Sequence, residues 1–374
     1  MKVAIVHDWI TNLGGGEECL KELAELFPEA PIYTLVSTKE SLQRSNIKEQ
    51  RVTNSFIQKL PFGNKKYRSL LALFPLAIEQ FDLSEFDVII SSSSSVAKGV
   101  LVHSNQLHIC YCHSPIRYAW DLHHQYLKEA GLHKGVKGFI AKSILHYIRN
   151  WDVSTHYRVD EFIANSEYIS KRIKRVYGRS STVIYPPVRT DHFQFSDQKE
   201  DFYLTVSRLV PYKKVDLIAE AFSKLPNHKL VIIGDGPQMK KVKKISSNVT
   251  NIEVKGYQEF EIVKDHMQRA KGFVFAAEED FGIVPVEAQA CGTPVICFGK
   301  GGTLETVKNE KTGVYFQKQT PDSIIKAIEK FEKIDFDYKY IREHSQKFKS
   351  EKFRNKIKNL IQKRSNAFFE NNAI

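Results

Sequence analysis

Short apolar runs alternate with amphipathic stretches along most of this chain. In the first half, such runs predict β-strands at 3–6, 32–36, 87–91, 109–111 and 162–165. In the second half, they predict strands at 203–206, 230–233, 252–255, 272–275, 294–297 and 313–316. Stretches between them, such as 215–225, 262–270 and 283–291, have helical character. Because strands that are apolar throughout are covered on both faces, the pattern predicts an α/β protein with parallel sheets flanked by helices.

Two such sheets fit the length of 374 residues, at roughly 150 residues per domain. The boundary falls near 185–189, where Pro186 and Pro187 follow one another. Because two prolines cannot continue a helix or a central strand, this segment is a linker. The sequence therefore predicts one domain over 1–186 and a second over 187–352. The charged stretch 338–369 is helical in character, and its apolar positions approximate one helix face: Phe348, Phe353, Ile357, Leu360 and Ile361.

Composition narrows the class of protein. Hydrophobic residues make up 42% of the chain and charged residues 26%, which excludes a mainly disordered or collagen-like chain. With 55 Lys and Arg against 43 Asp and Glu, the net charge is +12, which predicts anionic partners: phosphates, nucleic acid or a membrane surface. Five cysteines without a C-x-x-C spacing favour reduced thiols. No signal-peptide pattern and no run of 18 apolar residues is present, so we expect a cytoplasmic protein, free or lying against a membrane.

Two small-residue segments follow predicted strands of the first domain. The segment 12–18 reads Asn-Leu-Gly-Gly-Gly-Glu-Glu and includes Gly15 and Gly16. Glycines before a helix let backbone N–H groups approach an anion. Because the spacing is not G-x-G-x-x-G, a ligand-facing loop and a structural turn are the remaining interpretations. The serine run 91–95 is interpreted as a polar loop at a strand end, with ligand binding as the alternative.

Cations and glycines follow two strands of the second domain. Arg208 and Lys213 lie five residues apart in 207–214, directly after the predicted strand 203–206. Ligands of α/β sheets bind at the carboxyl ends of strands, where these two cations together can neutralise a diphosphate. A solvated basic turn is the alternative. The segment 234–237, Gly-Asp-Gly-Pro, indicates a turn before a helix, and its proline suits the first helical turn.

The acidic segment 278–294 has the sharpest pattern. Glu279 precedes a short predicted helix and Glu287 lies inside it, with Pro285 early in that helix and Gly292 at its end. A carboxylate accepts two hydrogen bonds side by side, which suits the vicinal diol of a ribose or hexose. The backbone N–H groups of 281–282 are expected to point toward an anion.

Together these motifs resemble the retaining nucleotide-sugar glycosyltransferases of family 4, in order and spacing over nearly the whole chain. The segments 7–17, 112–121 and 208–213 are similar to a bacterial subgroup that includes O-antigen and exopolysaccharide mannosyltransferases. The resemblance implies the GT-B fold, with two Rossmann-like domains and an active site in the cleft between them. It also implies that the first domain binds the acceptor, the second binds the nucleotide sugar, and a C-terminal helix of about 353–374 crosses back to the first.

The resemblance also implies roles for individual residues. Arg208 and Lys213 match the family's diphosphate-binding pair, and Glu287 matches the acid that holds the donor ribose. Glu279, with the backbone of Phe281 and Gly282, matches the contact to the hydroxyls of the transferred sugar. Gly15 and Gly16 match the N-terminal loop that closes on the diphosphate. His113 matches the histidine near the C6 hydroxyl of the donor sugar, close to the reacting centre.

Two positions depart from the family pattern. Lys214 and Asp280 stand where many relatives carry glycine, and the second departure leaves the identity of the sugar open.

Sugar transfer builds negative charge on the leaving diphosphate, which fixed cations can stabilise. We therefore expect no metal and no cofactor. The alternative of a metal-dependent transferase requires an Asp-x-Asp motif, and the match here, Asp335 with Asp337, falls in a charged segment predicted to be helical.

Two stretches of the first domain, 44–74 and 128–149, mix basic and apolar residues. This mixture favours binding to an anionic membrane surface, with two ordinary amphipathic helices as the alternative.

The leading hypothesis is thus a hexosyltransferase that moves mannose from GDP-mannose to a lipid-linked oligosaccharide or polysaccharide acceptor at the inner face of the cytoplasmic membrane. The alternatives are a related transferase using a UDP-sugar or GDP-rhamnose, and a basic nucleic-acid-binding protein. The last lacks any recognised nucleic-acid module.

Overall fold

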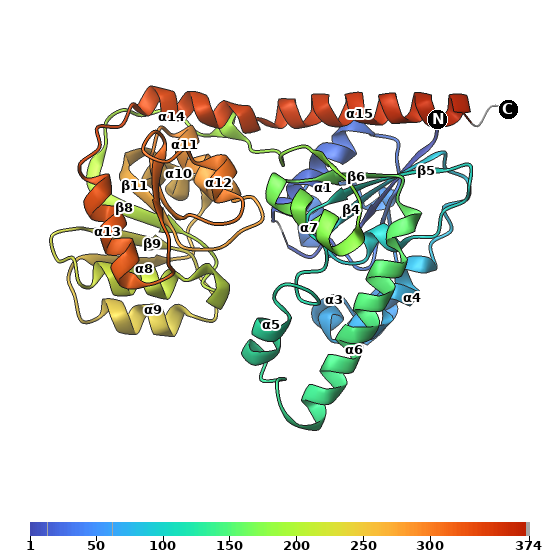
Figure 1. Cartoon of the computed structure of the whole chain (residues 1–374), viewed down its shortest axis with the longest axis horizontal. Helices are drawn as coiled ribbons and strands as arrows, with labels where there is room; N and C mark the ends of the chain where they lie inside the picture. Colours follow the sequence, from blue (N-terminus) through green and yellow to red (C-terminus); the bar gives the residue numbers. More distant parts are fainter. Residues whose placement is uncertain (13, 62, 372–374) are drawn as a thin grey trace. The chain divides into compact units, whose positions relative to one another are not determined.

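The computed structural model describes residues 1–12, 14–61 and 63–371. Contacts divide the chain into two units (Figure 1). Unit 1 comprises Met1–Pro186 and takes in the chain again from Phe353, and unit 2 comprises Pro187–Lys352. These bounds coincide with the domains expected from the two prolines and from the C-terminal helix.

Within its described residues, unit 1 contains a seven-stranded parallel sheet of order β3-β2-β1-β4-β5-β6-β7. Its strands are β1 (Val3–His7), β2 (Ile32–Thr34), β3 (Val52–Asn54), β4 (Val88–Ser93), β5 (Leu107–Cys112), β6 (Glu161–Ala164) and β7 (Thr182–Val183). Its helices are α1 (Gly15–Leu26), α2 (Lys39–Arg44), α3 (Gly63–Lys66), α4 (Phe74–Glu79), α5 (His123–Glu129), α6 (Gly135–Ser154) and α7 (Glu167–Tyr177), with α15 (Ser350–Asn371) entering from unit 2.

Unit 2 contains a six-stranded parallel sheet of order β10-β9-β8-β11-β12-β13 within the described residues. Its strands are β8 (Glu200–Val206), β9 (Leu230–Ile233), β10 (Ile252–Gly256), β11 (Ala270–Phe275), β12 (Val295–Phe298) and β13 (Gly313–Phe316). Its helices are α8 (Val215–Phe222), α9 (Met239–Ser246), α10 (Phe260–Arg269), α11 (Ile283–Ala290), α12 (Thr303–Thr306), α13 (Pro321–Phe331) and α14 (Tyr338–Ser345).

Every strand predicted from an apolar run is present, although the run at 32–36 ends as a strand at Thr34. The sequence did not predict β3 or β7. Both are outer strands of two or three residues, and their side chains are not fully buried. Because neither carries a continuous apolar run, periodicity gives no signal for them.

Local capping explains where individual helices begin and end. The Ser166 hydroxyl accepts a hydrogen bond from the backbone N–H of Ile169, which starts α7. Gly178 follows α7 with a left-handed φ of 69°, a conformation that glycine adopts without steric cost. Helix α13 begins in a similar way, because Thr320 caps it and Pro321 occupies its first position.

The C-terminal helix α15 packs on the sheet of unit 1 beside α1 (Figure 1). Phe353, Ile357 and Ile361 are buried in one cluster with Leu20 and Leu23 of α1. At about 25 cal/mol per Å² of apolar surface, each of these side chains contributes roughly 1.5–3 kcal/mol. The apolar face predicted from the sequence therefore fixes where the chain returns to its first domain.

The predicted helical stretch 338–369 is divided into α14 and α15. Asp335 lies between α13 and α14, and the Asp337 carboxylate accepts the backbone N–H of Tyr340 at the start of α14. The expectation that both aspartates sit within a helix is therefore wrong. All five cysteines are buried free thiols, as predicted.

Candidate active site

The predicted diphosphate and sugar contacts meet at one point of the unit 2 sheet. From β8 the chain runs outward through β9 and β10, and it then returns to β11 on the other side of β8. The order of the strands reverses between β8 and β11, and α/β sheets bind ligands at such a switch point. Arg208 and Lys213 follow β8, and Glu279 follows β11.

Lys213 and Glu279 are in direct contact at this switch point. The ammonium Nζ lies 2.6 Å from Glu279 Oε1, and each side chain is less than one-fifth exposed. The contact is an ion pair. Nζ also lies 5.6 Å from the ring centroid of Phe275. Since an ammonium has three donor hydrogens, Lys213 can hold Glu279 and still donate to a phosphate oxygen.

The turn that carries Arg208 is shaped by the glycines of 234–237. A Cβ at Gly234 would lie 1.8 Å from the carbonyl oxygen of Ser207, so this position admits no side chain. The Leu209 N–H donates to Asp235 O at 2.9 Å. The segment 234–237, whose sequence pattern alone is not specific, therefore lets the turn after β8 fold beside β9. In this turn the Arg208 side chain is exposed. Pro237 lies before α9, which begins at Met239, so its predicted place in the first helical turn is wrong.

The structure accounts for one departure from the family pattern. Lys214 has φ 56° and ψ 31°, in the left-handed region. An L-residue there costs roughly 1–2 kcal/mol more than glycine, which explains why glycine suits this position. Lys214 adopts this conformation in the turn between Lys213 and α8.

The acidic segment also folds as predicted. Gly282 caps α11 with φ 92°, Glu287 lies half-buried within that helix, and Gly292 follows its end with φ 80°. The sequence analysis missed the glycines at 301 and 302. The Gly302 N–H donates to Glu279 O at 2.8 Å, and a Cβ on Gly302 would lie 2.2 Å from the Cα of Phe281. This close approach holds the backbone of 279–281 in place.

Unit 1 has its own switch point, between β1 and β4, and His113 follows the neighbouring strand β5. His113 Nε2 lies 2.8 Å from the Ser92 hydroxyl, which in turn lies 3.1 Å from His7 Nδ1. Burial lowers the pKa of His7 to about 4 and that of His113 to about 3, so both rings are neutral at pH 7. From the sequence, only His113 of these three residues received a specific role, although His7 lies in the family-like segment 7–17 and Ser92 in the serine run.

Ser91 lies in a strand, as the predicted run 87–91 implied, whereas the interpretation as a polar loop is wrong for Ser92 and Ser93. Ser91, Ser92 and Ser93 belong to β4 and are at most 2% exposed. Their hydroxyls are tolerated inside the sheet because neighbouring groups bond them, as when Ser91 Oγ meets His108 Nε2 at 2.8 Å.

The remaining serines bind the buried carboxylate of Asp8, at the end of β1. Its two oxygens accept the backbone N–H groups of four consecutive residues at 2.6–2.9 Å: Ser94, Ser95, Val96 and Ala97. The Ser94 hydroxyl adds a fifth bond at 3.0 Å. A carboxylate bonded in this way ties the carboxyl ends of β1 and β4 together.

Gly15 and Gly16 form the first turn of α1, and Leu13 of the same motif lies outside the described residues. A Cβ on Gly16 would lie 3.7 Å from both His113 Nε2 and His7 Cε1, so this glycine lies against the two imidazoles. Glu17 is buried behind it. Burial, with a smaller contribution from Asp8, raises the pKa of Glu17 to about 7.

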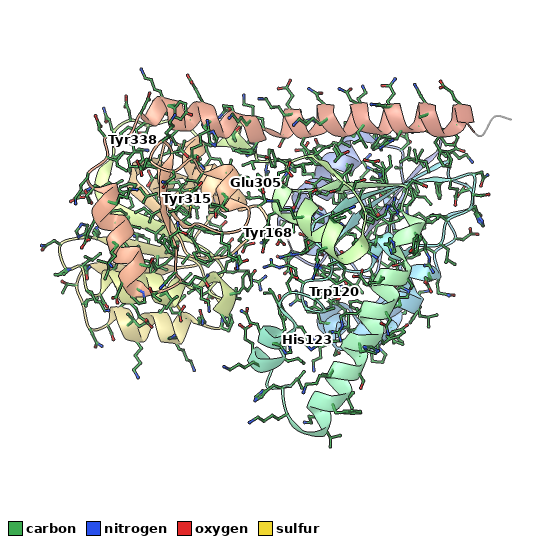
Figure 2. The ribbon with its side chains drawn as sticks, in the orientation of Figure 1. Trp120, His123, Tyr168, Glu305, Tyr315 and Tyr338 are labelled. Carbon is green, nitrogen blue, oxygen red and sulfur yellow. The ribbon has the colours of Figure 1, made fainter. Side chains whose placement is uncertain are left out.

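The segment after His113 is tied down at several points. The Asn165 amide donates to His113 O at 3.0 Å, and Arg172 pairs with Asp121. Trp120 and His123, both labelled in Figure 2, join the segment to α6. The Trp120 indole donates to the Asp152 carboxylate at 2.8 Å.

That carboxylate belongs to a buried charge pair that the sequence did not reveal. Lys98 Nζ lies 2.9 Å from Asp152 Oδ1, and both side chains are at most 1% exposed. The Tyr177 hydroxyl and the Thr155 hydroxyl bond the same pair. The network therefore holds the loop after β4, helix α6 and helix α7 together around Trp120.

The two basic stretches differ in the structure. In 44–74 the apolar side chains face the core: Ile57, Tyr67 and Phe74 are buried, and Leu70, Leu71 and Leu73 pack against the same cluster. The apolar side chains just named therefore do not form the exposed face that was predicted, and Phe62 of this stretch lies outside the described residues. In 128–149, by contrast, α6 exposes Val136, Phe139 and Ile140 by 53–77%. Among the described residues, no helix is both long enough and apolar enough to span a bilayer.

Comparison with known proteins covers both units. The family model described as Glycosyltransferase Family 4 matches residues 13–192, and the model described as Glycosyl transferases group 1 matches residues 188–352. An uncharacterized glycosyltransferase of Methanocaldococcus jannaschii is 31% identical over 173 residues, which cover 45% of this chain and 48% of that protein.

A GDP-mannose-dependent alpha-(1-6)-phosphatidylinositol monomannoside mannosyltransferase of Mycolicibacterium smegmatis is 29% identical over 195 residues, covering 44% of this chain and 50% of that protein. The chain thus spans about half the length of the curated relatives it matches.

The structure of Anabaena HepE in complex with UDP superimposes with a TM-score of 0.70 at 19% identity, covering 97% of this chain and all of that one. Together with the two parallel-sheet units, this likeness identifies the GT-B fold predicted from the sequence. The chain belongs to the family 4 glycosyltransferases.

Proposed function

We propose that the protein is a retaining hexosyltransferase that moves mannose from GDP-mannose to a lipid-linked glycan. The observation that carries this proposal is the contact of Lys213 with Glu279 at the switch point of unit 2, inside a match to a glycosyltransferase family model. The proposal assigns the cation to the diphosphate and the carboxylate in contact with it to the sugar. GDP-mannose is favoured because curated relatives at 28–29% identity are named as GDP-mannose-dependent enzymes.

In this proposal, charge on the protein replaces charge on a metal. As the bond to the diphosphate breaks, Arg208 and Lys213 stabilise the negative charge that develops on the leaving phosphate. Glu287 holds the donor ribose. Glu279 and the backbone of Phe281 and Gly282 hold the transferred sugar in a reactive orientation, to which His113 contributes from unit 1. Gly15 and Gly16 let the start of α1 approach the diphosphate.

A thermal-shift screen tests the donor. GDP and GDP-mannose should raise the melting temperature at concentrations where UDP, UDP-sugars and a short RNA do not, because a ligand stabilises the state it binds. GDP-rhamnose is included because it has the same base as GDP-mannose and a different sugar, so comparing the two shows whether the protein distinguishes the sugars. Stabilisation by UDP alone would overturn the choice of base, and stabilisation by RNA alone would overturn the proposal.

Two measurements test the proposed chemistry. Transfer should continue in excess EDTA, because Arg208 and Lys213 supply the positive charge. The product should keep the anomeric configuration of the donor, which the NMR coupling constant of its anomeric proton reports. Loss of transfer in EDTA or an inverted product would contradict the respective part of the mechanism.

We also propose that α6 holds the enzyme on an anionic membrane surface, where a lipid-linked acceptor lies. The exposed Val136, Phe139 and Ile140 are interleaved with exposed lysines of the same segment: Lys134, Lys137 and Lys142. Each lysine close to an anionic leaflet contributes about 1 kcal/mol, and shallow insertion of the apolar side chains adds to this.

Vesicle sedimentation tests the membrane proposal. Replacing Lys134, Lys137 and Lys142 together by serine should weaken binding to anionic vesicles by roughly 100-fold, since about 1 kcal/mol is lost at each. The matched control replaces three exposed lysines of α9, Lys240, Lys243 and Lys244, and should bind as the parent does. Equal binding by both variants would show that α6 is an ordinary solvated helix.

A further inference from the structure

The buried groups around His113 form one continuous chain of hydrogen-bonding side chains. Three neighbouring strands supply them: His7 ends β1, Ser92 lies in β4, and His113 follows β5. Ser92 is fully buried and His7 is 4% exposed. The Ser92 hydroxyl lies 3.1 Å from His7 Nδ1 and 2.8 Å from His113 Nε2, so it links the two rings.

A serine hydroxyl has a single proton to donate. If the Ser92 hydroxyl donates to His113 Nε2, that nitrogen carries no hydrogen, and a neutral His113 must carry its hydrogen on Nδ1. If His113 Nε2 donates instead, Nδ1 has a lone pair. Because burial keeps both rings neutral, the hydrogen-bond direction at Ser92 decides whether the other nitrogen of His113 donates or accepts.

The rings also have little freedom to turn. Gly16 lies against both of them, and the His113 and Tyr111 rings pack in a T-shaped arrangement with their centroids 5.1 Å apart. The backbone N–H of His113 donates to Ser93 O at 2.8 Å. His7 is held from the other end, because the neighbouring Asp8 is bonded to four consecutive N–H groups of the loop after β4.

We propose that His7 and Ser92 are positioning residues for His113, fixing the orientation of its ring and the tautomer in which its free nitrogen meets the transferred sugar. This inference rests on the proposed function of His113. It adds two residues to the site, and neither is exposed enough to bind the sugar itself.

The chain offers a matched control one residue away. Ser91 is equally buried and contacts a buried imidazole, His108 Nε2, at the same 2.8 Å. Alternate residues of a strand point to opposite faces of the sheet, so Ser91 lies away from His113. Removing either hydroxyl therefore creates the same kind of buried defect, and only the Ser92 change reaches His113.

Kinetics provide the first test. Ser92→Ala should lower kcat for transfer by about 10- to 100-fold with little change in the donor KM, because a reacting group is misplaced while binding is retained. Ser91→Ala should stay within about 3-fold of the parent. His7→Leu should resemble Ser92→Ala, and His7→Asn, which keeps a polar atom near the position of Nδ1, should recover part of the loss. Equal losses in Ser91→Ala and Ser92→Ala would overturn the proposal.

Imidazole ¹⁵N chemical shifts provide a second test that needs no activity. In selectively labelled protein, the Nδ1 and Nε2 shifts of His113 show which nitrogen carries the hydrogen, and Ser92→Ala should change them toward a mixture of tautomers. Ser91→Ala should leave the His113 shifts unaltered. Unchanged His113 shifts in Ser92→Ala would also overturn the proposal.

The two readouts separate this inference from the proposed function. If His113→Ala transfers sugar normally while Ser92→Ala alters the His113 shifts, the positioning chain exists and the role assigned to His113 is wrong. If Ser92→Ala does not fold, the transfer kinetics and the His113 ¹⁵N shifts are measured on His7→Leu and His7→Asn instead. Identical activities and identical His113 shifts in that pair and the parent would reject the inference.

Discussion

The two sheets carry their functional side chains at the same topological position, and the electrostatics of the two positions differ. At the switch point of unit 2, a partly exposed cation and a carboxylate lie in contact, Lys213 with Glu279, and Arg208 is exposed beside them. At the switch point of unit 1, the side chains His7, Ser92 and His113 form a neutral chain. The nearby charge on Asp8 is bonded entirely by the loop after β4.

Under the proposed function, this difference lets one architecture serve two purposes. Unit 2 keeps charges that still have hydrogen-bonding capacity, as a diphosphate requires. In unit 1, the buried charge of Asp8 is bonded by the loop after β4, and the side chains beside it are neutral, which suits the hydroxyls of a sugar. Changes at Asp8 should therefore act on stability, and changes at Lys213 should act on the reaction.

The largest effect is expected from Asp8→Asn. The amide can no longer accept all four N–H groups and brings its own hydrogens toward them, so we expect a loss of about 3–5 kcal/mol in the free energy of unfolding. This corresponds to a fall of roughly 6–20 °C in the melting temperature. Calorimetry measures it, with the exposed Asp82→Asn as a control that should change little. A melting temperature equal to that of the parent would show that Asp8 does not tie β1 to β4.

Next in size is Lys213→Ala. The loss of a charge-assisted contact should lower kcat/KM by about 30- to 1000-fold, or roughly 2–4 kcal/mol. The matched control is Lys224→Ala, which removes an exposed lysine paired with Asp322 in the same unit. Near-normal kinetics in a folded Lys213→Ala protein would remove Lys213 from the site, and unit 2 would no longer differ from unit 1 in function.

The two acids of unit 2 sharpen the comparison further. Glu287→Ala should raise the donor KM by about 10-fold with kcat nearly intact, because a ribose contact is similar in the ground and transition states. Glu279→Ala should also lower kcat by about 10- to 100-fold, because Glu279 positions the reacting sugar. Initial rates over a donor series distinguish the two, and identical kinetic behaviour would contradict the division of roles.

The last effect concerns Glu17 of unit 1 and depends on pH. Its pKa is raised from 4.5 to about 7, chiefly by burial. Between these values the folded state binds more protons than the unfolded state, so the contribution of Glu17 to stability falls as pH rises. Glu17→Gln, which cannot ionise, should therefore gain about 1–3 kcal/mol on the parent from about pH 5 to about pH 8.

The difference in melting temperature between Glu17→Gln and the parent at each pH measures this gain. The buried histidines of unit 1 also make stability depend on pH. Because the folded-state pKa values of His7, His108 and His113 are lowered, their stabilisation is present above about pH 6.5 and is lost as pH falls. They are present in both proteins, so their effect cancels in the difference. A difference that is constant with pH would contradict the raised pKa of Glu17.

The sequence alone predicted the α/β class, eleven of the thirteen strands described in the structure, and the segments that carry Arg208, Lys213, Glu279 and Glu287. These features depend on local pattern: buried parallel strands are apolar throughout, and glycines mark the strand ends. The family resemblance added the assignment of roles, which no spacing within the chain could supply.

Only the tertiary structure decided which polar residues meet. His7, Ser92 and His113 are 85 and 21 residues apart in sequence, and the register of β1, β4 and β5 brings them together. Lys98 and Asp152 form a buried ion pair because α6 packs against the loop after β4. No local sequence pattern predicts this pair. The apolar residues of 44–74 and 128–149 look alike in sequence, yet the first set enters the core and part of the second stays exposed. Local pattern records whether a residue is apolar or polar, whereas its partner and its exposure depend on contacts between distant segments.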